Sequence, residues 1–289
     1  MFSGFSQHRA NANGVEINFR RAGKGPPLLL LHGYPQTHAM WHAVAPRLAG
    51  TFTVIVADLR GYGDSGKPPG DTAHVTYSKR TMAQDMVDLM AGLGWRRFSV
   101  VGHDRGGRVA YRLALDHPAV VEKLAVLDIV TTHTMWMSMN KAMASASYHW
   151  LFLSQPDGLP ERMIGRDPEW YLRETLRRWT APGFTFAPEA MAEYVRCFND
   201  PAAIHAACED YRAGASIDFE LDSADFGQRK INCPVLALWG ETGIARRARD
   251  VLGAWRPWAD DVRGQAIDCG HFLAEEAPEE TVQALEAFL

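Results

Sequence analysis

The 289-residue sequence has no long hydrophobic run and no excess of charge of one sign. Its apolar runs, such as 28–31, are far shorter than the roughly 20 residues that span a bilayer, so no transmembrane helix is predicted. Residues 1–20 lack the charged start, apolar stretch and cleavage site of a secretory signal, so export is not expected. The formal net charge is −4, with Lys and Arg scattered among Asp and Glu. The sequence therefore predicts neither a nucleic-acid partner nor a membrane partner.

Cysteine is also scarce, and its four positions are widely spaced without a Cys-x-x-Cys pair. This spacing argues against a zinc site and against a disulfide framework. We therefore expect reduced thiols in the core of a cytoplasmic protein. Hydrophobic residues make up 47% of the chain and charged residues 22%, which is ordinary for a globular protein with a sizeable core. The cysteines are Cys197, Cys208, Cys233 and Cys269.

Several short apolar runs alternate with segments of helical periodicity. Apolar runs that are buried on both faces indicate strands of a parallel sheet covered by helices, and the alternation is typical of an α/β fold. Helical spacing follows Ser78, a candidate N-cap, and Pro278, a residue type that favours a helix start. The predicted strands are 27–31, 52–57, 98–101, 124–127 and 234–239.

The alternation stops between about residues 133 and 225. There Trp, Tyr, Met and Arg are dense, and helical stretches follow one another without a strand-like run. We interpret residues 133–225 as a helical cap inserted into one sheet domain. Residues 1–132 and 226–289 would form the two parts of that domain.

The strongest chemical signal is the segment 100–107, Val-Val-Gly-His-Asp-Arg-Gly-Gly. An apolar strand that runs into glycines and then a helix is the nucleophile-elbow arrangement, which holds one side chain on a tight turn. Asp104 occupies that position. Its carboxylate needs no proton removed before it attacks, which suits displacement at a saturated carbon or opening of an epoxide. Alone, Gly-x-Asp-x-Gly is more often a plain turn, so the other motifs decide whether Asp104 is interpreted as a nucleophile.

A second segment supports the elbow. The loop 31–35, Leu-His-Gly-Tyr-Pro, directly follows a predicted strand, where this arrangement places an oxyanion-binding N–H group. The backbone N–H groups of Tyr34 and Arg105 would then hold the oxyanion that forms when an ester on Asp104 is hydrolysed. An ordinary strand-ending loop is the alternative interpretation.

The order of residues along the chain predicts a base and its acid partner. His271 lies late in the sequence, which gives the order nucleophile, acid, histidine. Asp128 ends the run 124–127 and should lie at the same edge of the sheet as the elbow. Bonded to the imidazole, it would fix the tautomer and stabilise imidazolium. Glu241, after the next core strand, is the alternative acid.

Two arginines follow the nucleophile. Arg105 and Arg108 are three residues apart on the helix that begins at the elbow, so both can lie on one face. Together with the helix N-terminus they form an anion site, which predicts a substrate with a carboxylate close to the reacting carbon. Arg112 and Asp116, by contrast, have the spacing of a solvated surface pair.

The segment interpreted as a cap carries aromatic donors. Tyr148, His149, Trp150 and Tyr211 offer O–H and N–H groups that can stabilise a departing halide. From spacing alone, packing is the commoner role of such residues.

Together these motifs resemble the fluoroacetate dehalogenases, also called haloacetate dehalogenases, of the α/β-hydrolase superfamily. The resemblance covers essentially the full chain, and Asp-Arg at the elbow with His-Trp in the cap is its most selective part. It implies an α/β-hydrolase fold with a mostly parallel central sheet, helices on both faces and an inserted helical cap, in a homodimer. The segments that carry it are 32–38, 102–106, 148–150, 208–214 and 270–273.

The resemblance also implies roles. Asp104 would attack the halogen-bearing carbon of a small haloacid, and His271, oriented by Asp128, would activate the water that releases glycolate. No cofactor and no metal are implied, because water and side chains suffice for this chemistry. Arg105 and Arg108 would bind the carboxylate, Trp179 and Tyr34 would line the pocket, and His149, Trp150 and Tyr211 would bind the halide. Tyr34 stands where the family has phenylalanine.

Two other functions fit part of the pattern. The loop 58–65 resembles epoxide hydrolases equally well, and these use the same Asp-His-Asp triad with two cap tyrosines. Tryptophan after the nucleophile is more usual there than Arg105. A receptor of hydrolase fold that binds a small acid without processing it is a further alternative, against which the complete triad argues. The candidate cap tyrosines are Tyr148, Tyr171, Tyr194 and Tyr211.

Overall fold

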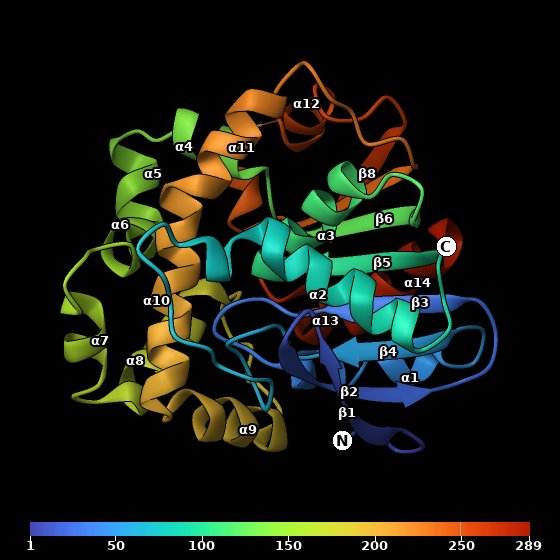
Figure 1. The fold of residues 1–289 in the computed structure, drawn as a ribbon, viewed down its shortest axis with the longest axis horizontal. Coiled ribbons are helices and arrows are strands. Elements are labelled where there is room, and N and C mark those ends of the chain that lie inside the picture. Colours follow the sequence, from blue (N-terminus) through green and yellow to red (C-terminus); the bar gives the residue numbers. More distant parts are fainter. Residues whose placement is uncertain (249) are drawn as a thin grey trace.

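The computed structural model describes residues 1–248 and 250–289 and is built on one eight-stranded sheet (Figure 1). The strand order is β1-β2-β4-β3-β5-β6-β7-β8. β1 (Ser6–Ala12) and β2 (Val15–Ala22) form an antiparallel hairpin that also pairs antiparallel with β4, and all other neighbours are parallel. The further strands are β3 (Pro27–Leu31), β4 (Thr53–Ala57), β5 (Phe98–His103), β6 (Val121–Leu127), β7 (Val235–Gly240) and β8 (Val262–Ile267). The predicted mostly parallel α/β sheet is confirmed.

Helices cover the sheet. α2 (Lys79–Gly92) and α3 (Asp104–Asp116) lie side by side in front of the strands in Figure 1. The side chain of Ser78 accepts a hydrogen bond from the N–H of Thr81, so the predicted N-cap of α2 is confirmed. Further elements are α1 (Ala45–Leu48), η1 (His38–Trp41), η2 (Val75–Tyr77), η3 (Ala245–Ala248), α12 (Val251–Trp255), α13 (Leu273–Glu276) and α14 (Pro278–Phe288).

Between β6 and β7 the chain forms helices and loops, with one isolated β-bridge from Ile231 to Ala259. The helices gather at one end of the sheet in Figure 1, and the first begins at Thr132, one residue before the start that the sequence predicts. Over the described residues, no helix is long and apolar enough to cross a membrane. These helices are α4 (Thr132–Met137), α5 (Lys141–Ala146), α6 (Tyr148–Leu153), α7 (Leu159–Ile164), α8 (Pro168–Trp179), α9 (Pro188–Phe198), α10 (Pro201–Ala215) and α11 (Ile217–Asp225).

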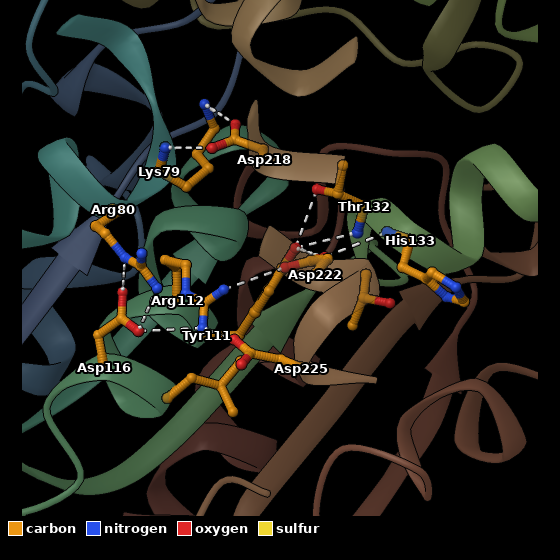
Figure 2. Close-up of polar contacts among 12 residues, drawn as sticks. Lys79, Arg80, Tyr111, Arg112, Asp116, Thr132, His133, Asp218, Asp222 and Asp225 are labelled. Atoms are coloured by element: carbon orange, nitrogen blue, oxygen red, sulfur yellow. Dashed lines mark hydrogen bonds and ion pairs between the residues drawn. The ribbon is translucent and has the colours of Figure 1, made fainter. Parts of the chain in front are cut away.

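One prediction about the surface is wrong. Arg112 was expected to form a solvated pair with Asp116, and the pair exists at 3.1 Å, but the side chain of Arg112 is only 1% exposed. The reason is that α11 covers it, since Arg112 also forms ion pairs with Asp222 and Asp225 of that helix (Figure 2). The spacing along one helix contains no information about a second helix packed on it.

Candidate active site

The nucleophile elbow is present at the end of β5. Asp104 has a φ of +45°, in the left-handed region that a residue with a Cβ rarely adopts. Its glycine neighbours permit the turn, because a Cβ on Gly102 would lie 2.4 Å from the carbonyl oxygen of Gly106. A Cβ on Gly106 would lie 2.3 Å from the carbonyl oxygen of His32. The packing therefore holds Asp104 in a strained backbone conformation at the edge of the sheet, as is common at functional sites.

The Asp104 carboxylate is buried and ionised. The backbone N–H of Tyr34 donates a hydrogen bond to its Oδ2 at 3.0 Å. Burial by itself raises the pKa of this carboxyl, but the electrostatic influence of the His271 and His103 imidazoles and of the two arginines that follow the elbow lowers the pKa by more. The net pKa lies below the ordinary value. The group is therefore in the form that attacks carbon without prior loss of a proton.

His271 and Asp128 form the second part of the site. Nδ1 of His271 lies 2.5 Å from Oδ2 of Asp128, which also accepts the backbone N–H of Ile244 at 2.7 Å. Among the described residues, the buried Nε2 of His271 has no hydrogen-bond partner. Glu241, the alternative acid, is exposed. The Asp128 contact fixes the proton on Nδ1 and leaves Nε2 as the acceptor.

The loop that carries His271 is tied to α8. The backbone N–H of His271 donates to the carbonyl oxygen of Trp179 at 2.9 Å. Glu276 accepts the N–H of Gly270 at 2.9 Å and the N–H of Ala181 at 2.7 Å. The position of the imidazole therefore depends on the end of α8. Sequence reasoning missed Glu276, because no motif marks a carboxylate whose partners are backbone groups.

Arg105 is buried and already paired. Its Nη2 and Nε donate to the carboxylate of Asp210 on α10 at 2.6 and 3.1 Å. Asp210 also accepts the hydroxyl of Tyr62 at 2.6 Å and binds the ammonium group of Lys79. Nη1 of Arg105 is buried and lacks a partner in the described part of the chain. One side of this guanidinium therefore remains for a ligand. Sequence reasoning quoted Asp210 in the segment 208–214 but assigned it no role.

Arg108 differs from Arg105 in its charge balance. It is 3% exposed, donates to Oγ1 of Thr132 at 3.2 Å and lies 4.5 Å above the ring of Trp150. Within residues 1–248 and 250–289, no carboxylate forms an ion pair with it, and burial lowers its pKa. An unpaired buried charge is costly, so this position favours an anionic ligand.

The predicted pocket residues form one aromatic wall. The ring of Tyr211 lies 5.3 Å from that of Tyr34, 5.6 Å from His149 and 5.7 Å from Trp150. His149 in turn lies 4.5 Å from Trp179. The buried hydroxyl of Tyr211 has no hydrogen-bond partner among the described residues. The structure therefore brings together all five residues that the family resemblance placed in the pocket.

This wall contacts both Arg105, which follows the elbow, and His271. The Arg105 guanidinium lies 4.3 Å from the ring centre of Tyr211, and the ring of Trp179 lies 5.4 Å from that of His271. Aromatic walls exclude water and strengthen electrostatic interactions inside a site. In the described chain, no group of three or more His, Cys, Asp or Glu side chains is arranged to hold a metal ion.

Comparison with known proteins agrees with this geometry. The family described as the alpha/beta hydrolase fold matches residues 26–278. A fluoroacetate dehalogenase from Burkholderia sp. is 46% identical over all of this chain and 95% of its own. A soluble epoxide hydrolase from Corynebacterium sp. (strain C12) is 36% identical over 96% of this chain and 95% of its own. The crystal structure of ALR0039 from Nostoc sp. PCC 7120 superimposes with a TM-score of 0.98 at 58% identity, covering 100% of this chain and 99% of that one. The chain therefore belongs to the α/β-hydrolase fold family.

Proposed function

We propose that the protein is a hydrolytic dehalogenase that converts haloacetates, fluoroacetate among them, into glycolate and halide. The observation that carries this proposal is the unpaired, buried guanidinium of Arg108 in the same site as the ionised carboxylate of Asp104. A haloacetate fits both, because its carboxylate is bonded directly to the carbon that is attacked. The identity of 46% with a fluoroacetate dehalogenase supports the same substrate class.

In the first step, a carboxylate oxygen of Asp104 attacks the halogen-bearing carbon, and the carbon–halogen bond breaks with its electron pair on the halide. An ester between Asp104 and the substrate carbon results. Arg108 and Nη1 of Arg105 hold the substrate carboxylate. Fluoride is small and strongly hydrated, so donors in the pocket must replace its water as it leaves. The halide donors are His149, Trp150 and Tyr211.

In the second step, Nε2 of His271 takes a proton from water, and the hydroxide attacks the carbonyl carbon of the ester. Asp128 stabilises the imidazolium that forms. The backbone N–H of Tyr34, which already donates to the Asp104 carboxylate, binds the developing oxyanion together with the N–H of Arg105. Collapse releases glycolate and restores Asp104. The net reaction consumes one water and releases one halide and one proton.

Helices α4 to α11 act in this proposal as a cap that closes over the site. The support is that α10 supplies both Tyr211 of the aromatic wall and Asp210, the partner of Arg105. The homodimer and the cytoplasmic location remain predictions from the family resemblance and from the cysteine pattern.

The test is release of fluoride from fluoroacetate by the purified protein, measured with an ion-selective electrode. We expect turnover by the wild type and none by Asp104→Ala. Arg108→Leu should lower kcat/KM about 10- to 100-fold, because a hydrogen bond to a charged group is worth about 1.5–3 kcal/mol. The matched control is Arg173→Leu, since Arg173 is half-exposed and pairs with Glu169 on the surface. Steady-state turnover by Asp104→Ala would overturn the mechanism.

Epoxide hydrolysis is the second candidate. The buried, unpartnered hydroxyl of Tyr211 favours it, because a phenol can donate a proton to the oxygen of an opening epoxide. The identity of 36% with a soluble epoxide hydrolase points the same way. Consumption of styrene oxide without halide release from any haloacetate would favour this candidate. Saturable binding of fluoroacetate, with no turnover of halides, epoxides or esters, would favour the receptor alternative.

A further inference from the structure

The orientation of Arg108 depends on a hydroxyl group rather than on a carboxylate. Arg105 is held on two nitrogens by Asp210, whereas the hydrogen bond of Arg108 runs from Nη1 to Oγ1 of Thr132 at 3.2 Å. A long side chain with several rotatable bonds needs such a contact to stay in one orientation. Whatever fixes the Thr132 hydroxyl therefore also fixes the guanidinium.

Thr132 is fixed by Tyr111. The hydroxyl of Tyr111 lies 3.0 Å from Oγ1 of Thr132 and also accepts the backbone N–H of Thr132 at 3.1 Å. Tyr111 lies on α3, three residues after Arg108, so both side chains lie on one face of the helix. The two contacts hold the first residue of α4 against that face.

Tyr111 is in turn fixed by Asp222 of α11. Its hydroxyl lies 2.6 Å from Oδ2 of Asp222, and Figure 2 shows these side chains meeting beside Arg112. Asp222 is 1% exposed, and its Oδ2 also accepts the backbone N–H of His133 at 3.2 Å. Arg112 approaches the other oxygen of Asp222 at 3.6 Å. A continuous buried chain of contacts therefore joins α11 to Arg108.

The charge on Asp222 sets the direction of the hydrogen bonds in this chain. An ionised carboxylate only accepts, so Tyr111 must donate its single proton to Asp222. The oxygen of Tyr111 then accepts the proton of the Thr132 hydroxyl. A lone pair of Thr132 is left to accept the N–H of Arg108. A neutral Asp222 removes this constraint, because a carboxylic acid can donate to Tyr111 and Tyr111 can then donate to Thr132. The oxygen of Thr132 must in that case accept from Tyr111 and Arg108 at once, which competes with its hydrogen bond to Arg108.

We propose that Tyr111 and Asp222 are positioning residues that act through Thr132 to hold Arg108 in the orientation that binds a carboxylate. The proposal rests on the assignment of Arg108 as the carboxylate-binding residue of the proposed function. It assigns to α11 a role in substrate binding although this helix contributes no residue to the aromatic wall described above.

The positioning should depend on pH. Burial raises the pKa of Asp222 to about 6, against the opposing effects of the Tyr111 hydroxyl, of Arg112 and of the His133 N–H. Asp218, on the same helix, raises it further. As the pH falls through about 6, Asp222 takes up a proton. The hydrogen bonds that run from Asp222 to Arg108 then lose their fixed direction. Carboxylate binding should therefore weaken on the acidic side of that pH.

The experiment measures binding of acetate, an unreactive carboxylate, by isothermal titration calorimetry. Tyr111→Phe removes the central hydroxyl, and Asp222→Asn removes the charge with little change of shape. The matched control is Asp225→Asn, because Asp225 also joins α11 to Arg112 but, among the described residues, forms no hydrogen bond or ion pair with Tyr111 or Thr132. Thermal unfolding of each variant reports any loss of folded protein.

We expect Tyr111→Phe to weaken acetate binding about tenfold, the effect of losing one or two hydrogen bonds in the chain. Asp222→Asn should weaken acetate binding and remove the change near pH 6 that the wild type and Asp225→Asn retain. Binding within twofold of the wild type in both variants, or an equal loss in Asp225→Asn, would overturn the proposal. So would a wild type that binds no acetate.

Fluoride release is measured on the same preparations, and it separates the two proposals. A wild type that binds acetate with the expected pattern of variants, but releases no halide, contradicts the proposed reaction and leaves the positioning intact. A wild type that releases fluoride while both Tyr111→Phe and Asp222→Asn bind acetate within twofold of the wild type contradicts the positioning alone.

Discussion

The surroundings of individual carboxyl groups in this protein shift their pKa values in opposite directions. Asp104 and Asp210 lie beside positive charges that outweigh the effect of burial, so their pKa values lie below the ordinary value. Glu275 instead bonds to the amide of Gln36 and the hydroxyl of Tyr194, and Nδ1 of the His42 imidazole lies 3.9 Å from its Oε1. Burial therefore raises the pKa of Glu275 to about 8. Glu275 should be protonated at neutral pH.

This shift predicts a pH dependence of stability. Between the ordinary pKa of 4.5 and the folded pKa of about 8, the folded state binds a proton at Glu275 that the unfolded state has lost. The free energy of unfolding should therefore fall as the pH rises through that window. Each unit of pKa difference corresponds to about 1.4 kcal/mol. Glu275→Gln should flatten this part of the profile.

The measurement is urea denaturation between about pH 5 and pH 9, with a linear extrapolation at each pH. Glu279→Gln is the control, since that side chain is 63% exposed and pairs with Arg47 at the surface. If Glu275→Gln shows the same slope as the wild type, the buried acid is not the source of the pH dependence.

At the scale of elements, the close contact between the loop after β3 and the elbow after β5 is the most sensitive feature. A Cβ on Gly33 would lie 2.5 Å from Cβ of Asp104, closer than real Cβ contacts. Gly33→Ala should therefore displace the nucleophile or the Tyr34 N–H beside it. We expect a loss of turnover of about 100-fold or more, since one oxyanion donor alone is worth that much.

Gly92→Ala at the end of α2 is the matched control, because a Cβ there meets nothing within 4 Å. Its turnover should equal that of the wild type, and its thermal stability should be equal or higher. Halide release and thermal unfolding are measured for both variants. Normal turnover by Gly33→Ala would show that the elbow tolerates displacement.

The central elements could be predicted from the sequence because burial on both faces leaves a continuous apolar run. β3, β4 and β7 follow this rule within one residue, whereas β1 is largely exposed and β8 alternates between exposed and partly buried positions. These two strands were not predicted. The elbow was predictable for a different reason, since only glycine fits beside it.

The distant carboxylate partners of Arg105 and Tyr111 could not be predicted. Asp210 lies 105 residues from Arg105 along the chain, and the contact exists only because the fold brings the Asp210 side chain of α10 to the start of α3. Asp222 reaches Tyr111 in the same way, across 111 residues. A helix pattern identifies the apolar face of one helix but not which polar residue of a second helix will meet it. The error on Arg112 has the same origin.

At the scale of the whole molecule, the sheet domain and the helices between β6 and β7 are joined by buried charges. Asp210 binds Arg105 of α3 and Lys79 of α2 at once, with no exposure of its own side chain. Breaking a buried ion pair leaves uncompensated charge, which costs about 3–5 kcal/mol. Asp210→Asn should therefore lower the free energy of unfolding by that amount and raise KM for fluoroacetate, because Arg105 loses its support.

Urea denaturation and halide-release kinetics measure the two effects. Glu169→Gln breaks an exposed pair with Arg173 and serves as the comparison, with an expected change of about 0–1 kcal/mol. Equal stability of Asp210→Asn and wild type would show that the buried ion pairs of Asp210 do not hold the helices between β6 and β7 against the sheet and its flanking helices.

The central claim is that Asp104 forms a covalent ester with the substrate. It is tested most directly by a single turnover of fluoroacetate in oxygen-18 water, followed by mass spectrometry of the peptide that contains Asp104 and of the glycolate. Attack of water on the ester carbonyl places the label in Asp104 and leaves the first glycolate unlabelled. Label in the glycolate, with none in Asp104, would show direct attack of water on the substrate carbon and contradict the account.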